Sequence, residues 1–460
     1  MNRERQKSEK ACSGLSEGEA QEDTETGVEL FMASEINKSQ ESTSQIMEEV
    51  CQPKNLLEAL RRVKQNRGCP GVDGMTVKEL PEYLQKNWTK VREQLLEGNY
   101  KPQSVRRVEI PKPDGGKRQL GIPTVMDRLI QQALHQVLQG RWDHKFSQHS
   151  HGFRPGRSAH GAIKEAKQYV EEGYRYVVDI DLEKFFDKVN HDKLMSYVGE
   201  RIRDKRVMKL IGRYLRAGAV MGEGVTIVRK EGTPQGGPLS PLLSNLYLNE
   251  LDKELERRGH RFVRYADDCN IYVKSERAGQ RVKENVRRWI EKKLKLKVNE
   301  QKSAVDEVTK RKFLGFSLIT IKDDVKIVVA RSSLKRLKRE IRRLTCRTRG
   351  WEISRIINVL NRYLRGWLGY YGICQNSGIF KQIDGWIRRR LRAIIWKQWK
   401  SCQRRRKGLI SRGINKLKAA KAAGSSKGAW RMSRAQAMNV AFPIVYFQEL
   451  GLQPLVTRRF

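Results

Sequence analysis

The stretch RFVRYADDCNIYV, residues 261–273, decides how we interpret the chain. Two runs rich in Val, Ile, Tyr and Phe flank an Ala-Asp-Asp corner, a pattern typical of a β-hairpin. The adjacent carboxylates of Asp267 and Asp268 repel each other unless they share a cation, so a divalent metal is the expected partner. An isolated Asp-Asp pair is more often a solvated turn. The rest of the sequence decides between these two interpretations.

A third carboxylate is expected from the segment YRYVVDIDL, residues 174–182, which reads as a buried strand that ends in acid. Asp179 and Asp181 lie on the same face because side chains alternate along a strand, so the sequence leaves both as candidates. With the Asp-Asp corner, either would complete a two-metal site for nucleotidyl transfer, whose ions lie roughly 3.5–4 Å apart.

Charge indicates the kind of partner. The chain has 460 residues and a net charge of +41, and residues 1–50 carry 12 acidic against 5 basic residues. Residues 331–460 carry 32 basic and 4 acidic residues, a density that favours nucleic acid. No apolar run approaches the roughly 20 residues of a membrane span, so we expect no membrane association. The seven cysteines show no CxxC spacing, which fits a reducing cytoplasm.

Composition predicts an α+β chain with four regions. Residues 1–43 are acidic and poor in large apolar residues, so we expect a disordered extension. Residues 44–325 mix helical and strand periodicity, including an alternating, strand-like LKLKV at residues 294–298. Residues 326–400 are basic and helical, with aromatics that are more often core than stacking platforms. Residues 401–460 comprise a basic connector and a small terminal module.

Three loops suggest ligand contacts. The pattern around Asp114-Gly115-Gly116 predicts a basic hairpin over residues 105–122, which is suited to grip a triphosphate or is an ordinary solvated hairpin. The loop HGFRPGRS, residues 151–158, suggests approach to a phosphate backbone, with a plain surface turn as the alternative. The Gly- and Pro-rich residues 232–240 permit close backbone approach to a ligand.

These segments, taken together and in order, resemble the sequence blocks of group II intron-encoded reverse transcriptase/maturases. The similarity extends over about residues 45–325, with maturase-like and DNA-binding-like features beyond it. The blocks are GCPGVDG at 68–74, IPK at 110–112 with RQLGIPT at 118–124, GFRPGRS at 152–158, Asp181 with FFD at 185–187, TPQGGPLSP at 233–241, YADD at 265–268, Lys302-Ser303, FLGF at 313–316 and RYLRGW at 362–367.

The resemblance implies a right-hand polymerase: fingers and palm with an antiparallel sheet, then a helical thumb/maturase domain and a small basic C-terminal module. It selects Asp181 over Asp179 and implies two Mg²⁺ ions, with Mn²⁺ as a possible substitute. The implied residues are, for metal and catalysis, Asp181, Asp267, Asp268 and the backbone carbonyl of Leu182; for the nucleotide, Lys112, Arg118, Gln235 and Phe186 as a steric gate against the 2′-hydroxyl; and for nucleic acid, Arg154, Arg157, Arg388, Arg389 and Arg390.

The implied activity is RNA-directed DNA synthesis for retrohoming, combined with binding of intron RNA to assist splicing. The implied partners are group II intron RNA, an RNA template with a DNA primer, target DNA and dNTPs, in a bacterial, nucleoid-associated setting. Two alternatives remain: a splicing cofactor with a vestigial polymerase site, and a reverse transcriptase recruited to phage defence. All seven histidines lie at or before His260, so we expect no His- and Cys-bearing endonuclease domain. The oligomeric state is not predicted.

Overall fold

The chain divides into two units that each contain sheet and helix. The computed structural model describes residues 46–111, 116–220, 226–227, 231–233, 236–322, 324–375 and 377–456. The first unit comprises residues 1–162 and 176–305, and the second comprises residues 163–175 and 306–460. The first unit therefore ends earlier than the predicted domain boundary at residue 325, and a short internal segment packs with the second.

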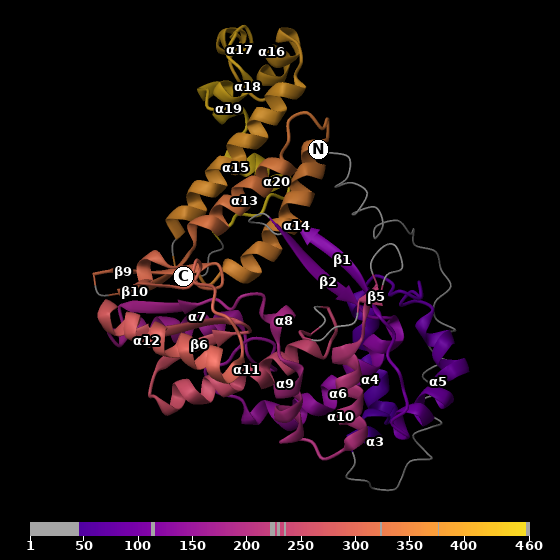
Figure 1. Cartoon of the computed structure of the whole chain (residues 1–460). Coiled ribbons are helices and arrows are strands. Elements are labelled where there is room, and N and C mark those ends of the chain that lie inside the picture. Colours follow the sequence, from indigo (N-terminus) through magenta and orange to yellow (C-terminus); the bar gives the residue numbers. More distant parts are fainter. Residues whose placement is uncertain are drawn as a thin grey trace. The chain divides into compact units, whose positions relative to one another are not determined.

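The sheet that carries the acidic segments belongs to the first unit and has the strand order β6-β7-β3-β8. Strand β7 pairs antiparallel with both of its neighbours. Hydrophobic residues on β3, β6 and β7 are buried because helices cover this sheet (Figure 1). The strands are β3 (Tyr176–Ile180), β6 (Arg261–Tyr265), β7 (Asp268–Val273) and β8 (Ala304–Glu307), the strand at which the first unit ends.

A second sheet of the first unit has the order β2-β1-β4-β5. Its strands are β1 (Val105–Pro111), β2 (Lys117–Ile122), β4 (Ala219–Val220) and β5 (Thr226–Ile227). The β1–β2 pair, in which Pro111 lies opposite Lys117, is the predicted basic hairpin, and its existence is confirmed. The residues expected to form its turn, 112–115, lie outside the described part of the chain.

Four of the described helices of the first unit begin at a side-chain cap. The Thr124 hydroxyl accepts from Asp127 N at the start of α6, and Asn190, Asp204 and Ser275 cap α9, α10 and α12. Their apolar faces pack into one core. The helices are α3 (Ile46–Val50), α4 (Pro53–Asn66), α5 (Leu80–Leu96), α6 (Val125–Trp142), α8 (Phe185–Lys188), α9 (His191–Gly199), α10 (Lys205–Arg216), α11 (Ser240–Arg257) and α12 (Glu276–Trp289), with a 3-10 turn at Asp143–Lys145.

The second unit is mainly helical, as predicted. Helix α14 buries an apolar stripe that includes Ile356, Leu360 and Leu364. Helices α16–α19 gather at one end of the long helix α15 (Figure 1). The elements are α7 (Ala159–Glu171), a 3-10 turn at Val308–Lys310, β9 (Phe316–Ile321), β10 (Asp324–Val329), α13 (Arg331–Leu344), α14 (Ile353–Tyr371), α15 (Ser377–Gln398), α16 (Cys402–Ile410), α17 (Lys416–Ala423), α18 (Ala429–Met432), α19 (Gln436–Ala441) and α20 (Ile444–Glu449).

The strand predicted at residues 294–298 is wrong. Ile290–Leu294 is a π-helical turn, and within the following residues only Val298 pairs, through an isolated bridge to Leu182. The alternation is nevertheless real, since Leu294, Leu296 and Val298 are buried. Alternation therefore predicted burial correctly but not ladder pairing.

The basic connector, residues 401–428, is largely helical. It forms the helices α16 and α17, which Ser401 and Asn415 cap. Leu409 and Ala419 are fully buried, because a small side chain on one helix lets the other approach closely. Among the described residues, no helix combines the length and the apolar character that crossing a bilayer requires. The predicted α+β class is confirmed.

Candidate active site

The predicted hairpin is confirmed: Tyr265 pairs with Asp268, so Ala266 and Asp267 form a two-residue turn between β6 and β7. Ala266 has φ 58°, in the left-handed region that side chains with a Cβ disfavour. Tight hairpin turns require such a residue because its backbone matches the twist of the strands. Asp267 therefore lies at the tip of the hairpin.

Asp181 follows strand β3, whose last residue Ile180 lies opposite Cys269 of β7. This pairing brings the end of β3 to the hairpin tip. Asp181 and Asp267 line one cavity of about 1200 Å³, and Asp179 is not among its lining residues. Of the two candidates that the sequence left open, Asp181 is the one that shares a cavity with the hairpin carboxylate.

Three residues of the segment 299–303 contact Asp181. Its backbone N–H donates to the Ser303 hydroxyl at 2.9 Å, and its carbonyl accepts from Asn299 N at 2.8 Å. The Lys302 ammonium lies 3.9 Å from its carboxylate. Sequence reasoning gave these residues no role, although Lys302-Ser303 stood among the matching blocks.

Burial raises the pKa of Asp181 above its usual range, even though Lys302 and a hydrogen bond from Asn299 oppose the shift. The negative charges of Asp267 and Asp179 raise it further. Two carboxylates that destabilise each other's charge in this way are suited to share a cation.

The donor set fits a hard divalent cation, since Asp181 and Asp267, which both line the cavity, offer carboxylate oxygens as ligands. Leu182 forms a bridge whose hydrogen bonds are made by its neighbours Asp181 and Glu183. Its own carbonyl therefore faces away from that bridge, as a further ligand requires. Asp268 begins β7 and does not line the cavity. In the described part of the chain, no three His, Cys, Asp or Glu side chains converge as a metal-binding group, so the predicted three-carboxylate arrangement stays a prediction.

The two phenylalanines after Asp181 have different environments. Phe185 is 2% exposed and packs in the core, whereas Phe186 is half-buried and its ring lies 5.2 Å from that of Phe185. Both line the cavity, at positions that follow Asp181 directly. Only Phe186 keeps an exposed part that a ligand in the cavity can contact.

The nucleotide-binding residues predicted from the loops are only partly described. Arg118 lines the cavity with Arg107 and Lys117. Lys112 and Gln235 lie outside the described residues. The backbone on either side of Gln235 is closely packed: Thr233 N donates to the Phe186 carbonyl at 2.6 Å, and a Cβ on Gly236 would lie 2.9 Å from the Gly121 carbonyl.

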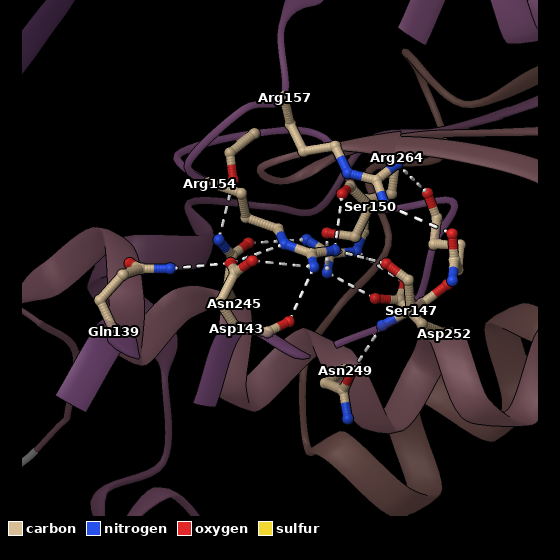
Figure 2. A network of polar contacts seen from close by, with 12 residues as sticks. Gln139, Asp143, Ser147, Ser150, Arg154, Arg157, Asn245, Asn249, Asp252 and Arg264 are labelled. Atoms are coloured by element: carbon tan, nitrogen blue, oxygen red, sulfur yellow. Dashed lines mark hydrogen bonds and ion pairs between the residues drawn. The ribbon is translucent and has the colours of Figure 1, made fainter. Parts of the chain in front are cut away.

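Figure 2 shows a network of polar contacts that includes Arg154 and Arg264. Arg154 is 8% exposed and its guanidinium donates to the Asp143 carboxylate and to the Ser147 and Ser150 carbonyls. These bonds tie the loop at residues 151–158 to residues 143–150, and the predicted phosphate contact of Arg154 stays a prediction. Arg157 is half-buried and donates to the Gln148 carbonyl at 2.9 Å.

The arginines predicted on α15 are half-buried, and two of them contact their own unit. Arg389 lies 3.7 Å above the Trp430 ring and donates to the Trp430 carbonyl. Arg390 donates to the Thr345 hydroxyl at 2.6 Å. These contacts give both residues structural roles, and nucleic-acid binding by Arg388, Arg389 and Arg390 stays a prediction.

The comparisons with known proteins agree with this arrangement. Residues 110–318 match the family described as reverse transcriptase (RNA-dependent DNA polymerase), and residues 334–412 match the group II intron, maturase-specific domain. The chain is 35% identical to Protein YkfC of Escherichia coli (strain K12), over 59% of this chain and 81% of that protein. The chain belongs to the group II intron-encoded reverse transcriptase/maturase family. The resemblance expected from the sequence blocks is thus confirmed.

Other members of the reverse transcriptase/maturase family are covered less fully. Group II intron-encoded protein LtrA of Lactococcus lactis subsp. cremoris is 29% identical, over 64% of this chain and 64% of LtrA. The putative COX1/OXI3 intron 2 protein of Saccharomyces cerevisiae (strain ATCC 204508 / S288c) is 32% identical, over 50% of this chain and 26% of that protein. The chain thus spans less than two thirds of either relative.

Proposed function

We propose that the protein is an RNA-directed DNA polymerase that copies intron RNA into DNA for retrohoming, and a maturase that binds the same RNA to assist splicing. The observation that carries the polymerase is the cavity shared by Asp181 and Asp267, with Phe186 and the basic residues of β2 in its lining. The match of residues 334–412 to a maturase-specific domain supports the second activity.

Asp181 and Asp267 would hold Mg²⁺, or Mn²⁺ as a substitute, with the Leu182 carbonyl as an additional oxygen. A bound divalent ion lowers the pKa of the primer 3′-hydroxyl and neutralises charge that develops on the triphosphate. Asp268 is the remaining predicted ligand. The protein's own contribution is then mainly to position the reactants and to supply compensating charge.

Other side chains of the cavity would bind the nucleotide. Arg118, with Arg107 and Lys117, supplies guanidinium and ammonium donors that are suited to phosphate oxygens. Phe186 would exclude a 2′-hydroxyl by steric clash. The proposed substrates are accordingly dNTPs, with an RNA template, a DNA primer and target DNA as partners. The basic second unit would hold these through their phosphates.

The test is RNA-templated extension of a DNA primer by the purified full chain. Asp181→Asn and Asp267→Asn should each lower the extension rate by about 1000-fold or more, because each removes a charged cation ligand. Asp179→Asn, the matched control on the same strand, should stay within about threefold of wild type, since Asp179 does not line the cavity. Binding of the parent intron RNA, measured in parallel, should be unchanged in all three variants.

If the Asp181→Asn variant extends the primer at the wild-type rate, the proposed catalytic role of Asp181 is wrong. A wild-type chain that binds and assists splicing of intron RNA without extending a primer would favour the alternative, a splicing cofactor with a vestigial polymerase site.

A further inference from the structure

An ion pair is buried behind the Ala266-Asp267 turn. The side chains of Arg264, on β6, and Asp252, on α11, are both 0% exposed. Arg264 Nε donates to Asp252 Oδ1 at 2.7 Å, and Nη2 donates to Oδ2 at 2.5 Å, so the contact is bidentate (Figure 2). Buried charges are costly unless they are paired and fully hydrogen-bonded. We therefore expect the remaining donors of Arg264 to have partners as well.

Every donor of the Arg264 guanidinium is used. Nη1 donates to the Ala266 carbonyl at 2.8 Å and to Asn245 Oδ1 at 3.2 Å, and the second hydrogen of Nη2 is directed to the Ser150 hydroxyl at 2.8 Å. With the two bonds to Asp252, these account for all five donors that an arginine has. A lysine cannot reproduce this pattern, because its donors diverge from one atom.

The contact with Ala266 is the one that concerns the active site. The Ala266 carbonyl belongs to the peptide unit that leads into Asp267, and a peptide unit is planar. Fixing the direction of that carbonyl therefore fixes the amide nitrogen from which Asp267 begins. Ala266 needs such support because it holds a φ of 58°, which is unfavourable for a residue with a Cβ.

The loop before Arg154 contacts the same turn. A Cβ on Gly152 would lie 2.3 Å from Ala266 N, so only glycine fits at this point. The Gly152 carbonyl accepts from Asn245 Nδ2 at 2.8 Å, and Asn245 is itself a partner of Arg264. The turn is thus packed by the loop at its backbone and hydrogen-bonded by the guanidinium.

We propose that Arg264, neutralised by Asp252, is a positioning residue that fixes the Ala266-Asp267 peptide and so directs Asp267 into the cavity that it shares with Asp181. This inference rests on the proposed polymerase function.

The decisive variant is Arg264→Met with Asp252→Leu, because apolar replacement of a whole buried ion pair is often tolerated by the fold. We expect a folded protein whose rate of single-nucleotide extension on an RNA template falls about 10- to 100-fold, the cost of a misplaced catalytic group. The loss should appear in kcat more than in the KM for the dNTP. Amide hydrogen exchange of residues 265–270, measured by mass spectrometry on the protein without metal or nucleotide, should become faster.

The matched control is Arg206→Met with Glu48→Leu. In this pair Arg206 Nη1 lies 2.7 Å from Glu48, and Arg206 Nη2 also contacts Asp204 at 3.0 Å. All three residues belong to the same unit, and none of them lines the cavity. The control should leave extension and the exchange of residues 265–270 at wild-type levels. Circular dichroism and thermal melting report whether each variant folds.

If the double variant does not fold, Arg264→Lys replaces it, because this change keeps the charge opposite Asp252 but cannot satisfy Asp252 and Ala266 together. A folded variant of either kind that extends and exchanges like wild type overturns the proposal. If the wild-type chain itself extends no primer, the proposed function fails. The exchange measurement then still decides whether Arg264 holds the turn.

Discussion

The ammonium of Lys302 lies 3.9 Å from the Asp181 carboxylate, and both side chains are substantially exposed, at 59% and 40%. An exposed pair of this kind contributes less than about 1 kcal/mol to stability. Its importance is therefore expected in the cavity, where Lys302 supplies positive charge beside the proposed catalytic carboxylate of Asp181.

Replacing Lys302 with Met should raise the KM for the incoming dNTP by about tenfold with a smaller change in kcat, because a cation that lines the proposed nucleotide site is lost. Steady-state single-nucleotide extension measures both parameters. Lys297→Met is the control, since Lys297 is exposed on the same segment and does not line the cavity. An unchanged KM in the Lys302 variant would argue that the nucleotide does not bind on this side of the cavity.

Phe186→Ala should relax the exclusion of rNTPs, because the half-buried ring is the bulky group that follows Asp181 in the cavity lining. We expect the ratio of dNTP to rNTP kcat/KM to fall by at least about tenfold. Phe185→Ala should instead lower stability by about 3 to 5 kcal/mol, since that ring is buried in the core. Unchanged sugar selectivity in a folded Phe186 variant would argue against the gate.

Gly152→Ala should lower primer extension sharply, because the added Cβ would lie 2.3 Å from Ala266 N and displace the turn that carries Asp267. Gly140→Ala, near the end of α6, meets no atom within 4 Å and should stabilise the fold by about 0.5–1 kcal/mol. Extension assays combined with thermal melting separate the two effects. Equal activity of the two variants would mean that the turn tolerates displacement.

Stability should depend on His135 at mildly acidic pH. Burial, assisted by the positive charge of Arg62, lowers the pKa of His135 to about 4, and its buried Nδ1 has no hydrogen-bond partner among the described residues. The unfolded chain binds this proton below about pH 6.5, whereas the folded chain does not until about pH 4. His135 therefore favours the fold above about pH 6.5, and that stability is lost as the pH falls toward 4.

Between pH 7 and pH 5 this loss should amount to about 2 kcal/mol, measured by urea unfolding. His135→Leu should remove that part of the pH dependence, whatever other groups contribute. The same slope in the variant and in wild type would show that His135 has the same pKa in the folded and unfolded chain.

Replacing an exposed arginine of the second unit should change the salt dependence of RNA binding, whereas replacing an arginine that contacts its own unit should not. Arg339→Ala removes an exposed charge of α13 and should weaken RNA binding while lowering the slope of log K against log salt by about one. Arg389→Ala removes a cation that contacts Trp430, so the slope should persist while the terminal helices become more sensitive to protease. A lower slope of log K against log salt in the Arg389→Ala variant would support the predicted role of Arg389 in nucleic-acid binding.

Much of the candidate site was predictable, because hydrophobic alternation and turn residues report local structure directly. The hairpin at Asp267, the strand before Asp181 and the basic hairpin all follow from periodicity. Alternation left Asp179 and Asp181 equivalent, since it fixes a face but not a distance. The resemblance selected Asp181, and of the two only Asp181 lines the cavity with Asp267.

Other features depend on contacts between distant residues and have no local signal. Arg264 lies within an apolar strand and is buried only because Asp252, on another element, neutralises it. Arg154 stood in a loop that suggested a phosphate contact, yet its partners lie inside the protein. The β9–β10 hairpin was not predicted, since its turn places Lys322, at φ 47°, where glycine or asparagine is the usual signal.

The packing of residues 163–175 with the second unit has a practical consequence for dividing the gene. Val308 N donates to the Arg175 carbonyl at 3.0 Å, a bond that joins this segment to residues far downstream. An expression product that stopped at Val305 would keep the helix but lose the partners against which it packs. A fragment cut at that point should therefore expose an apolar surface and aggregate, so the shortest well-behaved product must extend beyond Val308.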